Sequence, residues 1–391
     1  MKRVAFTLIG GANWTGGYNY LLNLVTALSI QPKNPVICVL FFGDDVEHEY
    51  IEPFRKLPYT EIVRSKFINK SRQKISLIYA LLIGRDPKVY QLFRTHNIDV
   101  VFEAAHFHGW RGGIASVVWI PDFQHKLLPK MFSKSSLFGR ELRQQIQFFG
   151  KGIIMLSSND AKQTCEHLYP STIGKTEVVH FSIVPNNAID STQARVVADL
   201  YNLPKQYFFL PNQFWTHKNH HLVLDALIVL RQKGKNIVIV SSGKQNDNRS
   251  PNYFQGFKKK LELESLAESF LLLGLIPYHH IVQLMSASIA LINPSLFEGW
   301  STTVEEARSI GVPMILSDLG VHREQMGVDA QYFDPFSAES LAGVLEKFQP
   351  LTIIQREIKA QNAKNNSMKL VSKFSSDFVN TVERSYFYFN N

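Results

Sequence analysis

The chain has 391 residues, of which 45% are hydrophobic, 12% aromatic and 19% charged, with a formal net charge of +9 at pH 7. This length exceeds what one hydrophobic core usually supports, so the sequence predicts two domains, each with enough apolar residues for its own core. The apolar stretches are too short to span a bilayer, and the first residues do not resemble a secretory signal.

The two cysteines have neither metal-ligand nor redox spacing. Cys38 and Cys165 both lie in apolar or helical contexts. Isolated cysteines of this kind are usually buried and reduced. We therefore expect a cytosolic protein with two buried thiols.

A glycine-rich loop follows the first predicted strand. The strand covers residues 3–9, the loop holds Gly16 and Gly17 among other glycines, and from Leu21 apolar residues recur at helical spacing. The loop matches neither the G-x-G-x-x-G fingerprint nor the P-loop pattern. Taken alone, these glycines are explained at least as well by a tight turn as by a ligand.

Further strands in the first half indicate a parallel α/β sheet. They are predicted at 36–42, 99–102, 116–120 and 152–156. Asp122 and His125 follow the strand at 116–120, at the end of a strand where ligands of α/β proteins bind. The preceding strand is followed by three alternative candidates for the same position, Glu103, His106 and His108. Each of these residues taken alone is better explained as a structural polar residue than as a catalytic one.

Positive charge is concentrated in one part of the chain. Residues 51–150 hold 16 Lys and Arg against 7 Asp and Glu, a surplus of 9 that equals the net charge of the whole chain. The densest run interleaves cations with Phe67 and Ile68. A solvated cationic face explains such a run about as well as a surface that binds an anionic membrane. Nucleic acid ranks lowest, because no nucleic-acid motif accompanies the charge.

A second series of strands indicates a second doubly wound domain. The strands are predicted at 207–210, 237–240, 270–273, 288–292 and 313–316. Residues 185–205 carry the turn residues of a domain linker. Beyond Phe336 the chain is predicted to be helical, and the aromatic cluster at 386–389 needs an apolar surface to cover it.

The loop after the strand at 207–210 holds a candidate cation. Lys218 lies among aromatic residues and histidines beyond the end of that strand, which favours a binding role over simple solvation. His217, His220 and His221 do not predict a metal site, because neighbouring residues at a helix start point to different faces and no carboxylate is near.

The most informative segment is 295–313, which sets Glu298 and Glu306 eight positions apart. Its pattern predicts a strand, a loop and a helix that begins near Ser301 or Thr302, with free backbone N–H groups that form an anion site. Glu305 is interpreted as part of a capping box. From these residues alone, Glu298 and Glu306 fit a capping role about as well as a binding role.

Glu298, seven intervening residues and Glu306 resemble the E-x7-E motif of the retaining glycosyltransferases of family 4, which have the GT-B fold. Gly16-Gly17 resembles the glycine loop of that family, and Lys218 resembles a lysine that holds the donor diphosphate.

The chain departs from the family pattern in three places. Asn212 stands where the family commonly has Arg, and Pro121 stands where many members have a His. Ser301 replaces a Gly in the loop after the first Glu, which narrows the space beside the diphosphate.

The resemblance implies a role for each carboxylate. Glu298 would bind the hydroxyls of the donor sugar and Glu306 those of the nucleotide ribose, since an ionised carboxylate can accept two hydrogen bonds from a vicinal diol. The donor-binding candidates are Gly16, Gly17, Asn212, Lys218, Glu298, Gly299, Trp300, Ser301, Thr302, Thr303 and Glu306. The catalytic candidates are Glu298, Lys218, Asp122 and His125.

The GT-B fold implies two Rossmann-like domains that face each other across a cleft. We predict an acceptor-binding domain over 1–190 and a donor-binding domain over 191–371. The last helix, at about 372–391, is expected to cross back and pack on the first domain.

The implied activity is transfer of a hexosyl group from a nucleotide-diphosphate sugar to an acceptor hydroxyl with retention, without a metal or another cofactor. The acceptor would be a surface polysaccharide, a lipid-linked glycan or a soluble molecule. We expect a cytoplasmic enzyme that residues 51–150 can hold at the cytoplasmic face of a membrane. Two other classes stay open: a nucleotide-sugar epimerase or phosphorylase-like enzyme, and a binding or scaffold protein without catalysis.

Overall fold

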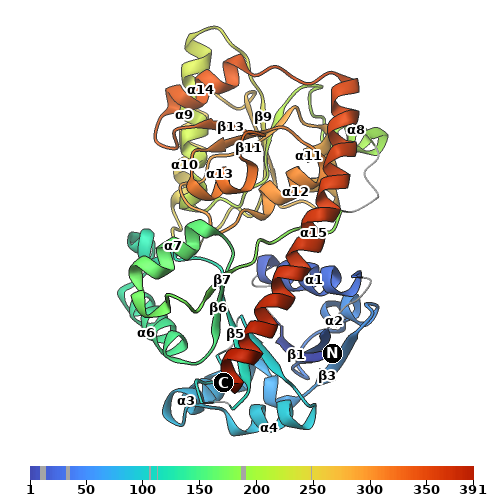
Figure 1. Ribbon diagram of the computed structural model, residues 1–391. Helices are drawn as coiled ribbons and strands as arrows, with labels where there is room; N and C mark the ends of the chain where they lie inside the picture. Colours follow the sequence, from blue (N-terminus) through green and yellow to red (C-terminus); the bar gives the residue numbers. More distant parts are fainter. Residues whose placement is uncertain (9–14, 32–35, 105–106, 112, 186–190, 248) are drawn as a thin grey trace. The chain divides into compact units, whose positions relative to one another are not determined.

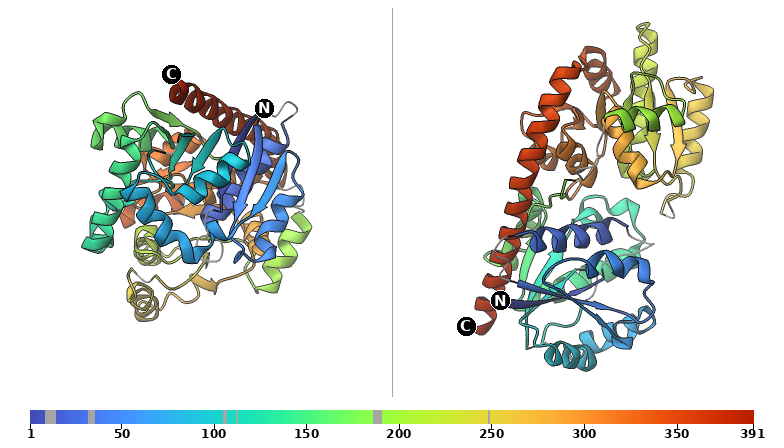
Figure 2. Two further views of the ribbon diagram at one scale, coloured as in Figure 1. Left: turned by 90° about the horizontal axis from the view of Figure 1, so that it is seen from below. Right: turned by 90° about the vertical axis from the view of Figure 1, so that its right-hand side faces the viewer.

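The structure is a computed structural model that describes all residues except 9–14, 32–35, 105–106, 112, 186–190 and 248. It divides into two compact units (Figure 1). The first unit comprises Met1–Val184 and Lys369–Asn391, and the second comprises Pro185–Met368. In each unit helices cover both faces of a parallel sheet (Figure 2).

The sheet of the first unit has seven strands in the order β3-β2-β1-β4-β5-β6-β7. All neighbouring strands pair in parallel. The strands are β1 (Lys2–Thr7), β2 (Val36–Phe42), β3 (Thr60–Arg64), β4 (Val100–Glu103), β5 (Ala115–Ile120), β6 (Ile153–Leu156) and β7 (Thr176–Val178).

Alternate residues of these strands face opposite layers of helices. Ala5 of β1 packs with Val89 and Phe93 on one face, whereas Phe6 stacks on Phe378 of the last helix on the other. The helices are α1 (Thr15–Ser29), α2 (His48–Arg55), α3 (Gln73–Leu82), α4 (Pro87–Thr95), α5 (Gln124–Leu127), α6 (Lys134–Phe149) and α7 (Asn159–Leu168). Cys38 and Cys165 are both buried free thiols, as predicted.

The sheet of the second unit has six parallel strands in the order β10-β9-β8-β11-β12-β13. They are β8 (Phe208–Leu210), β9 (Ile239–Ser242), β10 (Phe270–Gly274), β11 (Ala290–Asn293), β12 (Met314–Ser317) and β13 (Gln331–Phe333). The helices are α8 (Ser191–Leu200), α9 (His220–Gln232), α10 (Tyr253–Leu263), α11 (Tyr278–Ala287), α12 (Thr302–Ile310), α13 (Gly320–Met326) and α14 (Ala338–Lys347).

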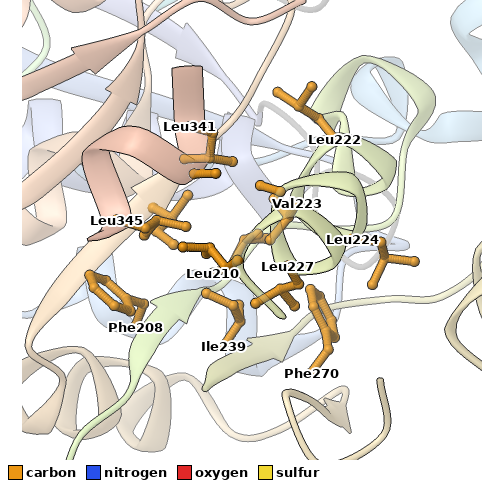
Figure 3. Close-up of a cluster of buried hydrophobic side chains, with 14 of the residues drawn as sticks. Phe208, Leu210, Leu222, Val223, Leu224, Leu227, Ile239, Phe270, Leu341 and Leu345 are labelled. Carbon is orange, nitrogen blue, oxygen red and sulfur yellow. The ribbon is translucent and has the colours of Figure 1, made fainter. Parts of the chain in front are cut away.

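One of the two cores of the second unit lies between its sheet and helices α9 and α14 (Figure 3). Leu210 and Phe270 face Leu227 and Leu345 there, while Phe209 faces the opposite core under α11 and α12. Strands that are buried on both faces are continuous apolar runs in the sequence, so they could be predicted from it.

The last helix, α15, runs from Ile353 to Asn390, and its final part belongs to the first unit. Phe378 and Val382 are buried against the first sheet, and Ser385 Oγ donates to the Ser116 carbonyl at 2.7 Å. The return of the last helix to the first unit is therefore confirmed.

The expectation that an apolar surface covers the cluster at 386–389 holds only in part: Tyr386 and Phe389 are half-buried, whereas Phe387 is 69% exposed and Tyr388 is also exposed. No helix in the described part of the chain is both long and apolar enough to cross a membrane.

Phe378→Ala should destabilise the first unit by about 3–5 kcal/mol, because it removes a fully buried ring that packs on Phe6 and Phe102. Urea unfolding measures this change. The matched control is Phe387→Ala on the same helix, which should change the free energy of unfolding by no more than about 0.5 kcal/mol. Equal effects of the two variants would contradict this packing.

Candidate functional site

The turn between β11 and α12 is the centre of the predicted site. Helix α12 begins at Thr302, as the sequence predicts, and ends at Ile310, with Gly311 as its C-cap. Gly311 has a φ of +74°, and a Cβ there would lie 2.7 Å from the Lys359 carbonyl oxygen, so glycine is required.

The prediction that Glu305 caps α12 is wrong. The N-cap is Ser301, which puts Glu305 one position too far along the helix for a capping box. The N–H of Ser301 instead donates to Gln325 Oε1 at 3.2 Å, and Glu305 accepts from Gln325 Nε2 and pairs with Arg308. The Ser301 N–H is thus already used, and the helix N–H groups nearest the turn are those of Thr302 and Thr303.

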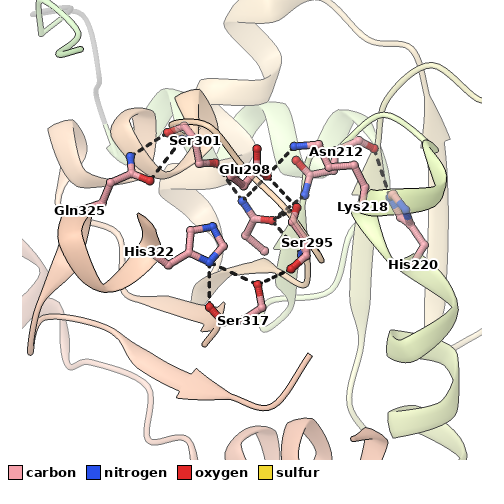
Figure 4. A network of polar contacts seen from close by, with 10 residues as sticks. Asn212, Lys218, His220, Ser295, Glu298, Ser301, Ser317, His322 and Gln325 are labelled. Atoms are coloured by element: carbon pink, nitrogen blue, oxygen red, sulfur yellow. Dashed lines mark hydrogen bonds and ion pairs between the residues drawn. The ribbon is translucent and has the colours of Figure 1, made fainter. Parts of the chain in front are cut away.

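Glu298 lies at the convergence of several donors (Figure 4). Its Oε1 accepts from Lys218 Nζ at 2.6 Å and from Ser295 Oγ at 2.7 Å. Burial opposes ionisation of Glu298, but the Lys218 ammonium and the hydrogen bonds outweigh it and hold the pKa at about 2. Glu298 is therefore a carboxylate at neutral pH, although its side chain is only 10% exposed.

A second layer of polar groups holds this turn. Asn293 Nδ2 donates to Ser301 Oγ at 2.9 Å, and Ser317 Oγ donates to the Ser295 carbonyl at 2.6 Å. The buried His322 lies 2.8 Å from the Ser317 carbonyl through Nδ1, which must donate because a carbonyl only accepts. Burial lowers the pKa of His322, so the ring is neutral. Its Nε2 is then an acceptor, and it has no hydrogen-bond partner in the described part of the chain.

The loop between β8 and α9 supplies the cation. Lys218 comes from this loop, and the N–H of Leu296 donates to the His217 carbonyl at 2.7 Å, which ties the loop to the β11–α12 turn. Burial lowers the pKa of both His217 and His220 to about 3, so neither ring carries charge at neutral pH. The described residues contain no cluster of three or more possible metal ligands.

Asn212 does not replace the family arginine as a charge. It is buried, and its Nδ2 donates to Asn293 Oδ1 at 3.3 Å, while its carbonyl contacts His220 Nε2. Another cation of the same unit, Arg249, lies over the Trp215 ring and is paired with Asp247.

Glu306 differs from Glu298 in its surroundings. It is half-buried, and Tyr278 donates to its Oε1 at 2.9 Å. Burial raises the pKa of Glu306 to about 7, against the opposing effect of the Tyr278 hydrogen bond. Of the remaining predicted donor residues in this turn, Gly299, Trp300 and Thr303 are half-buried and Thr302 is exposed.

The other predicted residues lie in the first unit. Gly16 and Gly17 form part of the first turn of α1, and most of the glycine loop before them lies outside the described residues, as does His106. Asp122 Oδ1 accepts from the Gln124 N–H at 2.9 Å, which makes an Asx turn before α5. Burial lowers the pKa of His125 and raises the pKa of Glu103 to about 8, although Arg143 acts in the opposite direction on Glu103.

Sequence reasoning missed several residues of the second-unit site. They are Tyr278, Asn293, Ser295, Ser317, His322 and Gln325. Asn293 and Ser317 are the last residues of β11 and β12, and Ser295 comes two residues after β11, so their position at strand ends is the signal that could have identified them.

The two parallel α/β units have the fold of GT-B glycosyltransferases such as WaaG. Residues 197–366, inside the second unit, match the family model of the glycosyl transferases group 1. The match covers most of the second unit, and it supports the resemblance to a glycosyltransferase family that was drawn from the sequence.

Proteins that are similar over most of the chain agree with this match. The chain is 24% identical over 348 residues to the O-antigen chain mannosyltransferase RfbU of Salmonella typhimurium, which covers 87% of this chain and 89% of RfbU. The fold is similar to that of Anabaena HepE in complex with UDP and glucose, with a TM-score of 0.68, 14% identity and coverage of 98% and 100%. It is also similar to WaaG, a glycosyltransferase involved in lipopolysaccharide biosynthesis, with a TM-score of 0.59, 12% identity and coverage of 99% and 98%.

Lys218→Met should lower the free energy of unfolding at pH 7 by about 3 kcal/mol, because it leaves the buried Glu298 carboxylate without its counter-charge. Urea unfolding measures the loss. Lys233→Met is the control, because Lys233 forms an exposed ion pair with Glu346. Removing that pair should change the free energy of unfolding by no more than the experimental error. If both variants lose the same stability, the Lys218–Glu298 pair is not held as described.

The raised pKa of Glu306 predicts a pH dependence of stability. Because the folded pKa exceeds the unfolded one, the stabilising contribution of protonated Glu306 is complete below about pH 4.5 and is lost as the pH rises through about 7. Wild type should therefore lose stability relative to Glu306→Gln over this window, as measured by urea unfolding at several pH values. Tyr278→Phe should move the upper end of this pH range higher, because the Tyr278 hydrogen bond lowers the pKa of Glu306. If the difference in free energy of unfolding between wild type and Glu306→Gln does not change with pH, the pKa of Glu306 is not raised in the folded protein.

Proposed function

We propose that this protein transfers a hexosyl group from a nucleotide-diphosphate sugar to a hydroxyl of an acceptor glycan, with retention at the anomeric carbon. The observation that supports it most directly is the pairing of Lys218 with Glu298 on the turn before α12, the helix that carries Glu306, inside the unit that matches the glycosyltransferase model. Anabaena HepE, which shares the fold, binds UDP and glucose.

The three charged residues suit three parts of one donor. Glu306 would accept hydrogen bonds from the ribose diol and Glu298 from hydroxyls of the sugar, because each carboxylate has free acceptor positions. Lys218 Nζ has three N–H donors, of which Glu298 uses one, so two are left for diphosphate oxygens. Since Nζ and Oε1 are only 2.6 Å apart, a sugar on Glu298 and a phosphate on Lys218 would be adjacent.

The chemical step breaks the bond between the anomeric carbon and the diphosphate oxygen. The acceptor hydroxyl oxygen forms the new bond on the same face of the sugar, its proton leaves with the departing diphosphate, and negative charge grows on that group. Lys218 and the N–H groups at Thr302 and Thr303 would stabilise this charge. The protein must place two substrates rather than supply a strong base, and no metal or other cofactor is part of the proposal.

The acceptor is proposed to be a surface polysaccharide or lipopolysaccharide glycan, because RfbU is named an O-antigen chain mannosyltransferase and WaaG acts in lipopolysaccharide biosynthesis. The acceptor would bind the first unit, where Asp122 and His125 are candidate contacts. Residues 51–150 would hold this cytoplasmic protein at a membrane face.

A second candidate function is a binding or scaffold protein that keeps the fold without catalysis. It is favoured by Asn212 and Pro121, which stand where family members commonly have Arg and His. Because Asn212 is buried and uncharged, the diphosphate would be held with one positive side chain fewer.

Thermal unfolding of wild type and Glu306→Ala with UDP, GDP, ADP, TDP or NAD tests the donor site. One nucleoside diphosphate, at a hundred times its dissociation constant, should stabilise the wild type by about 2.7 kcal/mol. Glu306→Ala should lose this gain, whereas the control Glu262→Ala, which removes an exposed carboxylate of α10, should keep it. Stabilisation by NAD alone, or by none of the five, would contradict a nucleotide-sugar site.

Labelled donor then separates transfer from the alternatives. We expect product only with acceptor present, and its anomeric configuration, measured by NMR, should equal that of the donor. An inverted product would contradict retention, isomerised donor without acceptor would indicate an epimerase, and binding without turnover would indicate a scaffold.

A further inference from the structure

Helix α3 in the first unit has its large apolar residues on the outside. Among its ten residues only Ala80 is buried, and the small Ser76 is half-buried one turn before it. The exposed apolar side chains are Ile75, Leu77, Ile78, Tyr79, Leu81, Leu82 and, directly after the helix, Ile83, with exposed fractions from 36% to 81%. A surface helix of a water-soluble protein normally turns such residues toward the core.

Nothing in the described structure covers this face. A cavity of about 140 Å³ lies beside α3. Its wall includes Gln73, Ser76 and Leu77 from the helix and Arg143 from α6. The large apolar residues of α3 therefore do little for the core of the first unit. A contiguous apolar patch of this kind marks an interaction surface.

The segment that contains α3 is cationic, and the acidic residues that contact it come from outside it: Asp45 accepts from the Lys70 N–H at 2.8 Å. Residues 62–85 contain six Lys and Arg and no Asp or Glu. Lys70 and Lys74 are exposed, and neither forms an ion pair in the described part of the chain. Arg72 is partly compensated, because it lies 3.5 Å from the buried Asp86.

We propose that α3 is an interfacial helix that inserts its apolar face into an anionic lipid bilayer, with Lys70 and Lys74 at the level of the phosphate groups. The helix is about 15 Å long, too short to cross a bilayer, so it would lie in the membrane plane. Lipid tails would cover the apolar residues, and anionic headgroups would neutralise Lys70 and Lys74, for which no ion pair is found in the described structure.

This inference deepens the membrane part of the proposed function and rests on it for the choice of partner. It assigns the contact to one helix and makes apolar insertion, not charge alone, the source of affinity. The donor site of the second unit plays no part in it.

Flotation with vesicles of phosphatidylcholine, with and without phosphatidylglycerol, tests the proposal. Wild type should bind the anionic vesicles. Ile78→Ser/Leu82→Ser should weaken partitioning by at least about tenfold, because two exposed apolar side chains no longer enter the lipid. The control Leu263→Ser/Val328→Ser changes side chains that are 73% and 98% exposed in the second unit, and it should bind like wild type.

Charge makes a separate, salt-dependent contribution. Lys70→Gln/Lys74→Gln should weaken binding to anionic vesicles by about tenfold or more at low salt and by less at high salt. All variants should unfold at the wild-type temperature, since the replaced side chains are exposed.

Three results would overturn the proposal. They are no wild-type binding to either vesicle, equal binding of wild type and Ile78→Ser/Leu82→Ser, and a wild-type dimer that this double variant abolishes. Nucleotide stabilisation of the same proteins reports on the donor site independently, so failure of the membrane contact and failure of the donor site give different outcomes.

Discussion

The ion pair between Lys218 and Glu298 is the constraint on which the second unit's site depends. A buried carboxylate is costly unless its charge and its lone pairs are satisfied, and here a lysine eighty residues away in the sequence supplies the charge. The sheet order β8-β11-β12 makes this possible, because it places the ends of three strands side by side. Asn293 and Ser295, at or just after the end of β11, then hold the carboxylate or the turn that carries it, and His322 donates to the Ser317 carbonyl at the end of β12. The pair that stabilises the turn is also the pair that would join a sugar subsite to a phosphate subsite.

The sequence predicted the interior of each sheet and missed parts of its edges. Strands such as β2 and β11 are buried on both faces and are therefore apolar, except for Asn293 at the end of β11, which makes them recognisable as apolar runs. The strands β3, β7 and β13 are edge strands with partly exposed residues, and their sequences contain Glu, Arg, Thr or Gln. Only pairing with a neighbour distinguishes such segments from loops, and pairing is a tertiary property.

The candidate site was predicted in part for a similar reason. Local sequence patterns located the start of α12, Glu298 and Lys218, because the ends of strands and the starts of helices have characteristic residues. Their contact was not predictable from spacing, since it depends on the order of strands in the sheet. The cap was misassigned by one residue because Gln325, from another helix, binds the N–H that a capping box would use. The unlike surroundings of Glu298 and Glu306, with a lysine at one and a tyrosine at the other, also arise only on folding.

The second unit carries the charges that suit the proposed nucleotide-sugar donor, and the first carries the exposed apolar helix α3 that is proposed to bind a membrane. A crystal structure with the stabilising nucleoside diphosphate bound tests the central claim most directly. The account predicts ribose hydroxyls within hydrogen-bonding distance of Glu306 and a diphosphate oxygen on Lys218 Nζ, with Glu298 free to accept from a sugar. A nucleotide bound away from the β11–α12 turn, or one that contacts neither Glu306 nor Lys218, would contradict it.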